Sequence, residues 1–165
     1  VACGAYHTLA TTTDGKLYAW GYNGSGQLGD GTTTARNSPV QIGALTTWSA
    51  PSGGTTHSTC TKTDGTVWTF GANTYGQLGD GTTTNRSSPV QVGALTTWSQ
   101  VEAGAYAVSA IKTDGTLWAW GRNQYGQLGQ GNTTNYSSPV QVGALTTWKV
   151  LAKMPKSQAP LVLID

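Results

Sequence analysis

The sequence predicts an all-β fold of the propeller type, built from tandem copies of one short unit. Three observations predict it. The tryptophans Trp48, Trp98 and Trp148 follow one another at 50-residue steps, without insertion or deletion. Each copy carries an Asp-Gly pair between two runs of β-prone residues. Glycine, with 23 residues, and threonine, with 28, are so frequent that no apolar stripe of helical period survives.

The repeat is nearly exact. Residues 13–48, 63–98 and 113–148 align without gaps, and 22 of the 36 positions are identical in all three copies. The shared frame reads T-D-G, then Trp or Phe before Gly, then N-x-x-G-Q-L-G-x-G-x-T-T, then S-P-V-Q-x-G-A-L-T-T-W. We expect one propeller array over residues 1–165, with units of about 1–50, 51–100 and 101–150 and with 151–165 starting a further blade.

Each unit is expected to contain four short strands. The pair Asp114-Gly115 predicts a two-residue hairpin turn, because primed turns need positive φ at their central positions. Asp14-Gly15 and Asp64-Gly65 predict the same turn in the other copies. Residues 139–142 form a third strand candidate, and the segment around each of the spaced tryptophans forms a fourth. Four strands per unit is the content of one propeller blade.

A glycine-rich loop follows the hairpin in every copy. In residues 123–138, Asn123 and Gln127 carry side chains that could bond the backbone of the turn, and Leu128 could pack the loop onto its blade. The identity of the first half in all three copies favours this structural role. A ligand-binding loop is the alternative.

The aromatic residues divide into two groups. Those at matching positions (Trp20, Phe70 and Trp120; Tyr18, Trp68 and Trp118) are expected to pack between blades. Positions that the repeat does not hold fixed are free to face a partner, and Tyr and Arg are favoured at interfaces. This argument predicts the following partner-binding residues: Tyr22, Arg36, Tyr75, Arg86, Arg122, Tyr125 and Tyr136.

Catalytic and metal chemistry find little support. His7 and His57 share a position that holds Ala107 in the third copy, so a structural role is expected. Cys3 and Cys60 stand where the other copies have small residues, which predicts buried core thiols. The acidic residues belong to turns and loops and form no converging pair. We therefore expect no enzyme, no cofactor and no metal site.

Charge argues against nucleic acid. Only 10% of the residues are charged, the formal net charge is +2, and the basic residues are dispersed. The apolar run near the end, 159–164, is too short for a membrane span. Composition, rich in Thr, Gly and Asn with little Lys, favours an extracellular, cell-surface or virion setting.

The heptad N-x-x-G-Q-L-G, with the preceding W-G and D-G and with G-A-Y-H-T-L-A at residues 4–10, resembles the repeats of the regulator of chromosome condensation family. The resemblance covers nearly the whole chain and implies a seven-bladed β-propeller. We expect an arc of about three blades, as part of a longer chain. An arc completed by further copies and a blade number other than seven are the alternatives.

The predicted function is a non-catalytic binding or structural module whose loop face meets a protein or glycan partner. Within the resembled family, the secreted propeller inhibitors of β-lactamase offer a functional model, because their ring face clasps another protein. The alternative is the family namesake's activity, guanine-nucleotide exchange with chromatin association. The uniform repeats show neither a wedge-like insertion nor a basic cluster, which that alternative would use.

Overall fold

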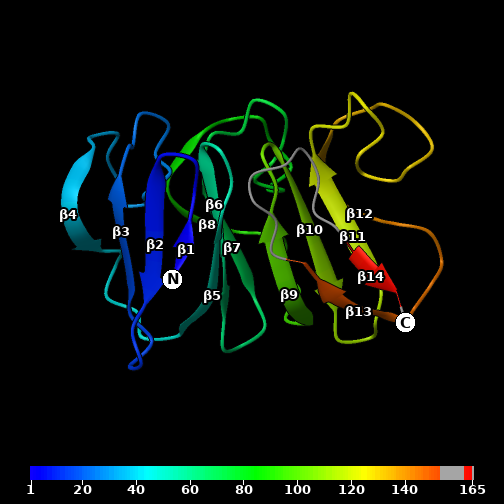
Figure 1. Ribbon diagram of the computed structural model, residues 1–165, viewed down its shortest axis with the longest axis horizontal. Coiled ribbons are helices and arrows are strands. Elements are labelled where there is room, and N and C mark those ends of the chain that lie inside the picture. The colour runs from blue at the N-terminus through cyan, green and yellow to red at the C-terminus, as the bar shows by residue number, and fades with distance from the viewer. Residues whose placement is uncertain (153–161, 165) are drawn as a thin grey trace.

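The protein is described from a computed structural model that covers residues 1–152 and, for the backbone, residues 162–164. All regular structure in this part of the chain is β-strand, arranged in three four-stranded antiparallel sheets and one two-stranded sheet (Figure 1). The first sheet contains β1 (Ala2–Cys3), β2 (His7–Thr11), β3 (Leu17–Gly21) and β4 (Arg36–Gln41). The second contains β5 (Trp48–Gly53), β6 (His57–Lys62), β7 (Val67–Gly71) and β8 (Arg86–Gln91). The third contains β9 (Trp98–Ala103), β10 (Ala107–Lys112), β11 (Leu117–Gly121) and β12 (Tyr136–Gln141). The last pairs β13 (Trp148–Leu151) with β14 (Val162–Ile164).

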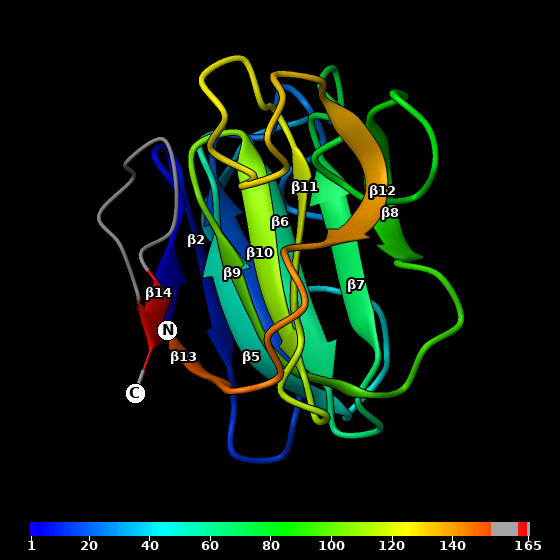
Figure 2. The ribbon, with the colours of Figure 1, turned by 90° about the vertical axis from the view of Figure 1, so that its right-hand side faces the viewer.

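The sheets stack face to face as successive blades. Their first strands are neighbours, since β5 contacts both β1 and β9, and β9 contacts β13. Figure 2 looks along the stack, with β10 and β11 in front of β6 and β7. This arrangement confirms the predicted all-β fold as a partial β-propeller.

The sheets are offset from the sequence units. Each blade is linked to the next through residues 42–47, 92–97 or 142–147, so the unit limits at 50 and 100 fall inside β5 and β9. Of the further blade predicted over 151–165, only Leu151, Ala152 and residues 162–164 are described. Residues 153–161 and 165 lie outside the described part of the chain.

The Asp-Gly pairs do form hairpins, but the predicted two-residue turn is wrong. The Thr12 N–H bonds to the Lys16 carbonyl at 2.9 Å, and the Gly15 N–H bonds to the Thr12 carbonyl at 3.0 Å. Three residues therefore connect the strands, and Gly15 takes φ 76° at the last of them. This is the three-residue hairpin loop with a left-handed glycine, which needs positive φ at one position only. The other two hairpins repeat these bonds.

Asparagine side chains shape the long loops, as predicted. Asn73 Nδ2 donates to the carbonyls of Thr82 and Thr84 at 3.0 and 3.1 Å, and the Leu78 N–H donates to Asn73 Oδ1 at 2.9 Å. The Tyr75 N–H donates to Gln77 Oε1 at 2.9 Å. Asn23 and Asn123 make the corresponding bonds to the leucine N–H of their own loops. Each loop is thus held by internal bonds.

Each of the first two loops packs against the following blade. The Gly31 N–H donates to the Ser87 carbonyl, and the Gly81 N–H to the Ser137 carbonyl, both at 2.8 Å. A Cβ on Gly76 would lie 2.5 Å from the Ser137 Cα. We call these contacts the loop clasp. The third loop makes no such contact within the described residues, and Gly129 is exposed where Gly29 and Gly79 are buried.

Aromatic rings fill the space between blades, as predicted for Phe70 and Trp120, whereas Trp20 of the first blade is half-buried. Phe70 and Trp120 are fully buried, and each closes on the preceding loop at Gly29 or Gly79. The Trp120 Nε1–H donates to the Gln77 carbonyl at 3.1 Å.

The two cysteines differ in burial. Cys60 is buried in the core of the first two blades, as expected, and its burial raises the pKa of the thiol to about 12. The prediction for Cys3 is wrong: it is exposed, because no described blade covers its side of the first sheet.

The loop clasp makes a stability prediction. Gly76→Ala and Gly126→Ala both place an alanine at φ near 77° and 76°, which should cost each variant about 1 kcal/mol. Only Gly76 approaches the next blade, whereas nothing lies closer than 4.0 Å to a Cβ on Gly126. We expect Gly76→Ala to lose about 1 to 3 kcal/mol more than Gly126→Ala through overpacking, as measured by urea unfolding. Equal losses would show that the clasp does not limit stability.

Candidate functional site

The three long loops lie at one edge of the stacked sheets, and the Asp-Gly hairpins lie at the other (Figure 1). At the loop edge, one residue just before the second strand of each blade is bonded to one just after the third. The Tyr22 N–H donates to the Tyr6 carbonyl at 2.8 Å, and the Arg122 N–H donates to the Tyr106 carbonyl at 3.0 Å. The same pair in the middle blade is Thr56 and Ala72. The backbone is constant here while the side chains vary.

A hollow opens on this edge above the first two blades. It has a volume of about 450 Å³ and is lined by Tyr6, Tyr22 and Thr56. The rings of Tyr6 and Tyr22 meet edge to face at 6.4 Å, and their exposed fractions are 67% and 51%. Amphipathic aromatic surfaces of this kind are typical anchors of protein interfaces.

An arginine surrounded by tyrosines lies over the second and third blades. The Arg122 Cζ is 5.0 Å from the ring centroid of Tyr75, 5.4 Å from that of Tyr106 and 6.0 Å from that of Tyr125. Tyr75 and Tyr106 also meet edge to face at 5.7 Å. Cation–π contacts of this kind fix the guanidinium in place. Tyr125 is the most exposed member, at 70%.

These residues form the candidate site, which we call the loop-edge surface: Tyr6, Tyr22, Thr56, Tyr75, Tyr106, Arg122 and Tyr125. Four of the seven predicted partner-binding residues belong to it. Tyr6 and Tyr106 are not among the predicted residues, although they lie next to the position of His7 and Ala107. Their position reads Tyr, Thr, Tyr in the three copies, so the variation between copies marks it as it marks the position of Arg122.

The other three predicted residues lie elsewhere, on the fourth strand of each blade. Arg36 forms an ion pair with Asp30 at 2.7 Å, and Arg86 pairs with Asp80 at 2.9 Å. In the third blade Tyr136 takes this place, and its hydroxyl accepts a hydrogen bond from Asn132 at 3.0 Å. All three side chains tie their long loop to its own outer strand. Their predicted role in partner binding stays a prediction.

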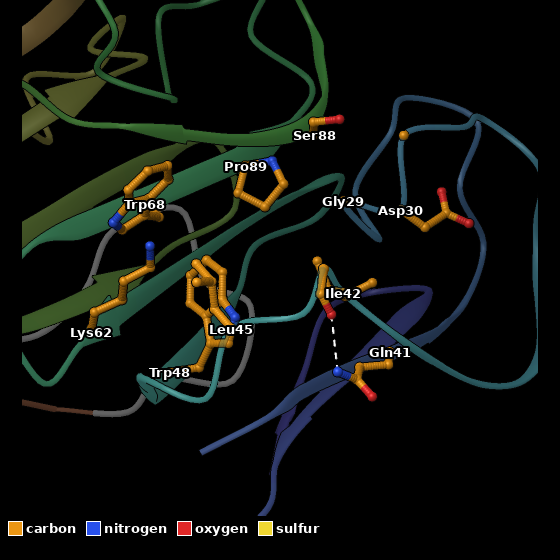
Figure 3. Close-up of a pocket in the computed structure, with 12 residues that line it drawn as sticks. Gly29, Asp30, Gln41, Ile42, Leu45, Trp48, Lys62, Trp68, Ser88 and Pro89 are labelled. Atoms are coloured by element: carbon orange, nitrogen blue, oxygen red, sulfur yellow. Dashed lines mark hydrogen bonds between the residues drawn. The ribbon is translucent and has the colours of Figure 1, made fainter.

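A crevice of about 390 Å³ separates the first two blades (Figure 3). Lys62 lies there between two tryptophans, with its Nζ 3.6 Å from the Trp68 centroid and 4.7 Å from that of Trp48. Burial lowers the pKa of Lys62. Lys112 repeats the arrangement in the third blade, 3.6 Å from Trp118. The contact recurs with the repeat, so we assign it to blade packing.

His7 forms a hydrogen bond between two blades, which is a structural role. The Ser58 hydroxyl donates to the Gln27 carbonyl at 2.7 Å, so in the 2.8 Å contact between Ser58 and His7 the His7 Nε2–H is the donor. This bond joins the first blade to the second. Across the described residues, no group of three or more His, Cys, Asp or Glu side chains could hold a metal ion. No helix in the described part is long and apolar enough to cross a membrane.

The ion pair of the second loop predicts a pH-dependent effect. Burial raises the pKa of Asp80, but the Thr82 hydroxyl and the Arg86 guanidinium lower it by more, so it stands below the ordinary 3.8. A lowered carboxyl pKa stabilises the fold above the unfolded pKa, and this stabilisation is lost as the pH falls through the folded pKa. We expect Arg86→Gln to cost about 1 kcal/mol of unfolding free energy at neutral pH and progressively less below 3.8.

Urea unfolding at several pH values measures this effect. The double variant Asp80→Asn/Arg86→Gln supplies the control, because it leaves no unpaired carboxylate. A cost of Arg86→Gln that is independent of pH would contradict the assignment.

Comparisons with known proteins agree with this architecture. Short segments match curated relatives closely: 47% identity over 45 residues with the mitochondrial RCC1 domain-containing protein RUG3 of Arabidopsis thaliana, covering 27% of this chain and 10% of the relative. The E3 ubiquitin-protein ligase HERC2 of Homo sapiens is 49% identical over 45 residues, 27% of this chain and 1% of the relative. The chain thus spans a tenth or less of these proteins' length.

Solved structures show the same fold over most of the chain. Human WBSCR16 superposes with a TM-score of 0.73 at 25% identity, covering 84% of this chain and 36% of that one. Prp20p of Saccharomyces cerevisiae, in a structure whose description names its binding to Gsp1p and histones, gives a TM-score of 0.76 at 21% identity, covering 88% and 38%.

The family models cover more than half of the sequence. The model described as regulator of chromosome condensation (RCC1) repeat matches residues 64–111 and 114–152. A second model of the same description matches residues 1–27 and 98–127. With the repeated blades and the loop clasp, these matches show that the chain belongs to the regulator of chromosome condensation repeat family.

Proposed function

We propose that this chain is a non-catalytic module that binds a protein through its loop-edge surface. The observation that carries the proposal is the cluster of tyrosines around Arg122, with Tyr125 exposed and Tyr75 and Tyr106 half-buried, beside loops held by internal hydrogen bonds. Tyr and Arg are enriched among the residues that dominate binding energies. Rigid loops lower the entropy lost when such side chains are immobilised in a complex.

The variation between copies supports the same surface. The loop frame is constant, while the position of Arg122 holds Tyr22 and Ala72 in the other blades. A repeat that needed only its fold would tolerate any polar residue there, whereas this chain places large aromatic and cationic groups around one point. A glycan is the alternative ligand, and an extracellular, cell-surface or virion setting remains part of the proposal on composition alone.

Guanine-nucleotide exchange or chromatin association is the second candidate. It draws on the likeness in fold to Prp20p, described as binding Gsp1p and histones. No basic cluster accompanies it here, since the nine Lys and Arg residues are dispersed. An exchange assay on a small GTPase and a histone-binding assay distinguish this candidate.

The proposal predicts a surface-specific loss of binding. The full chain would be immobilised on a resin and incubated with an extract of its source, and the captured proteins would be quantified by mass spectrometry. The purified partner would then be titrated against the chain to measure its affinity. We expect Tyr22→Ala/Tyr125→Ala to weaken that partner's affinity at least about tenfold, because truncated interface anchors commonly cost over about 1 kcal/mol each. Unfolding measurements should show this double variant folded, since the two rings are exposed.

A matched control lies at the opposite edge. Leu45→Ala/Leu95→Ala removes two side chains that are exposed by 49% and 44% in the links between blades. This control should bind the partner as the unmodified chain does. If the leucine variant loses the partner and the tyrosine variant keeps it, the binding surface is the link edge and the proposal is wrong.

A further inference from the structure

In the part of the chain that the structure describes, no acidic side chain pairs with Arg122. Among the described residues its Nε is buried without a hydrogen-bond partner, and its guanidinium lies against the rings of three tyrosines. A buried or half-buried cation without a counter-ion is unfavourable unless it is paired in the functional state. The neighbouring rings supply part of the stabilisation, but they accept no hydrogen bond in the plane of the guanidinium.

Every acid in the described part of the chain is engaged elsewhere. Three aspartates lie in the Asp-Gly hairpins at the opposite edge, where they bond to residues of their own turn: Asp14, Asp64 and Asp114. Asp30 and Asp80 are paired with Arg36 and Arg86. Glu102 lies on β9 and accepts a hydrogen bond from the Ser52 hydroxyl at 2.7 Å.

The long loop of the third blade lacks the carboxylate that the other two long loops carry. Where the first two loops have Asp30 and Asp80, the third has Gln130. Its outer strand has Tyr136 in place of Arg36 and Arg86, so the loop needs no acid of its own. Arg122 adds a positive charge to the one described loop from which the carboxylate is missing.

We propose that Arg122, held by Tyr75, Tyr106 and Tyr125, is the binding site for a carboxylate of the protein partner, supplied by an Asp or Glu side chain. This inference rests on the proposed function and adds the chemistry of the group that is recognised. The guanidinium fork matches a carboxylate with two parallel hydrogen bonds. The tyrosine rings orient the fork and shield the pair from water, which strengthens the interaction.

A direct test uses short peptides and the full chain. The blocked peptide Ac-Glu-Glu-Glu-NH2 would be titrated into ¹⁵N-labelled protein, with Ac-Gln-Gln-Gln-NH2 as the neutral probe. The Arg122 Nε–H resonance is identified by its disappearance in Arg122→Lys. We expect the glutamate peptide to shift this resonance and the amide signal of Tyr125, and the glutamine peptide to leave both in place. Equal shifts from the two peptides would overturn the proposal.

Variants then assign the effect to the guanidinium. Arg122→Gln should lower the affinity for the glutamate peptide about tenfold, because one close charge pair is lost. Arg122→Lys keeps the charge without the fork and should weaken it less. Lys16→Gln removes one positive charge at the opposite edge, where Lys16 pairs with Asp14 at 2.7 Å, and should leave the affinity unchanged. If Arg122→Gln binds as tightly as the unmodified chain, Arg122 is not the carboxylate site.

The two proposals fail in different ways. If Tyr22→Ala/Tyr125→Ala loses the captured partner while Arg122→Gln keeps it at unchanged affinity, the chain binds protein through this surface but not through a carboxylate. If the loop-edge surface captures no partner, the proposed function falls, and the peptide titration still decides whether Arg122 selects an acid.

Discussion

The hydrogen bonds of one asparagine side chain in each long loop are the interaction on which the rest of the structure depends. Asn73 joins the start of its loop to carbonyls nine and eleven residues further on. This closure gives the loop a fixed shape, so that Gly76 packs closely against Ser137 of the next blade and the Gly81 N–H donates to the Ser137 carbonyl. The stacking of the blades, and through it the position of the exposed tyrosines, follows from a polar side chain that is itself fully buried.

The sequence predicts the fold well because the residues that form the hairpins and hold the long loops recur in all three copies. The period, the Asp-Gly hairpins and the roles of Asn123, Gln127 and Leu128 can all be read from identical positions. The type of hairpin turn could not be predicted from the sequence, because Asp-Gly fits both a two-residue and a three-residue loop. The register of the strands distinguishes the two. The exposure of Cys3 could not be predicted from the sequence either, because it depends on which blade lies beside the first sheet.

The sequence predicts only part of the loop-edge surface. Variation between copies marks both Arg122 and Arg86, yet one faces tyrosine rings and the other an aspartate of its own loop. Arg86 pairs with Asp80 because the folded loop brings the two side chains together. An alignment of the repeat copies does not show this distance. Variation identifies positions released from the common frame, and the three-dimensional contacts decide which of them remain available to another molecule.

The loop clasp has a consequence for how such chains change length. Among the described strands, the main contacts between blades join successive blades, and the two described clasps use the same bonds, from Gly31 to Ser87 and from Gly81 to Ser137. In a protein with nearest-neighbour contacts, a whole unit can be duplicated or deleted at the DNA level and still meet a matching surface on either side. A change by part of a unit that ends inside a long loop would instead separate an asparagine from the carbonyls to which it donates. Selection on this architecture therefore acts on gene segments of one repeat length.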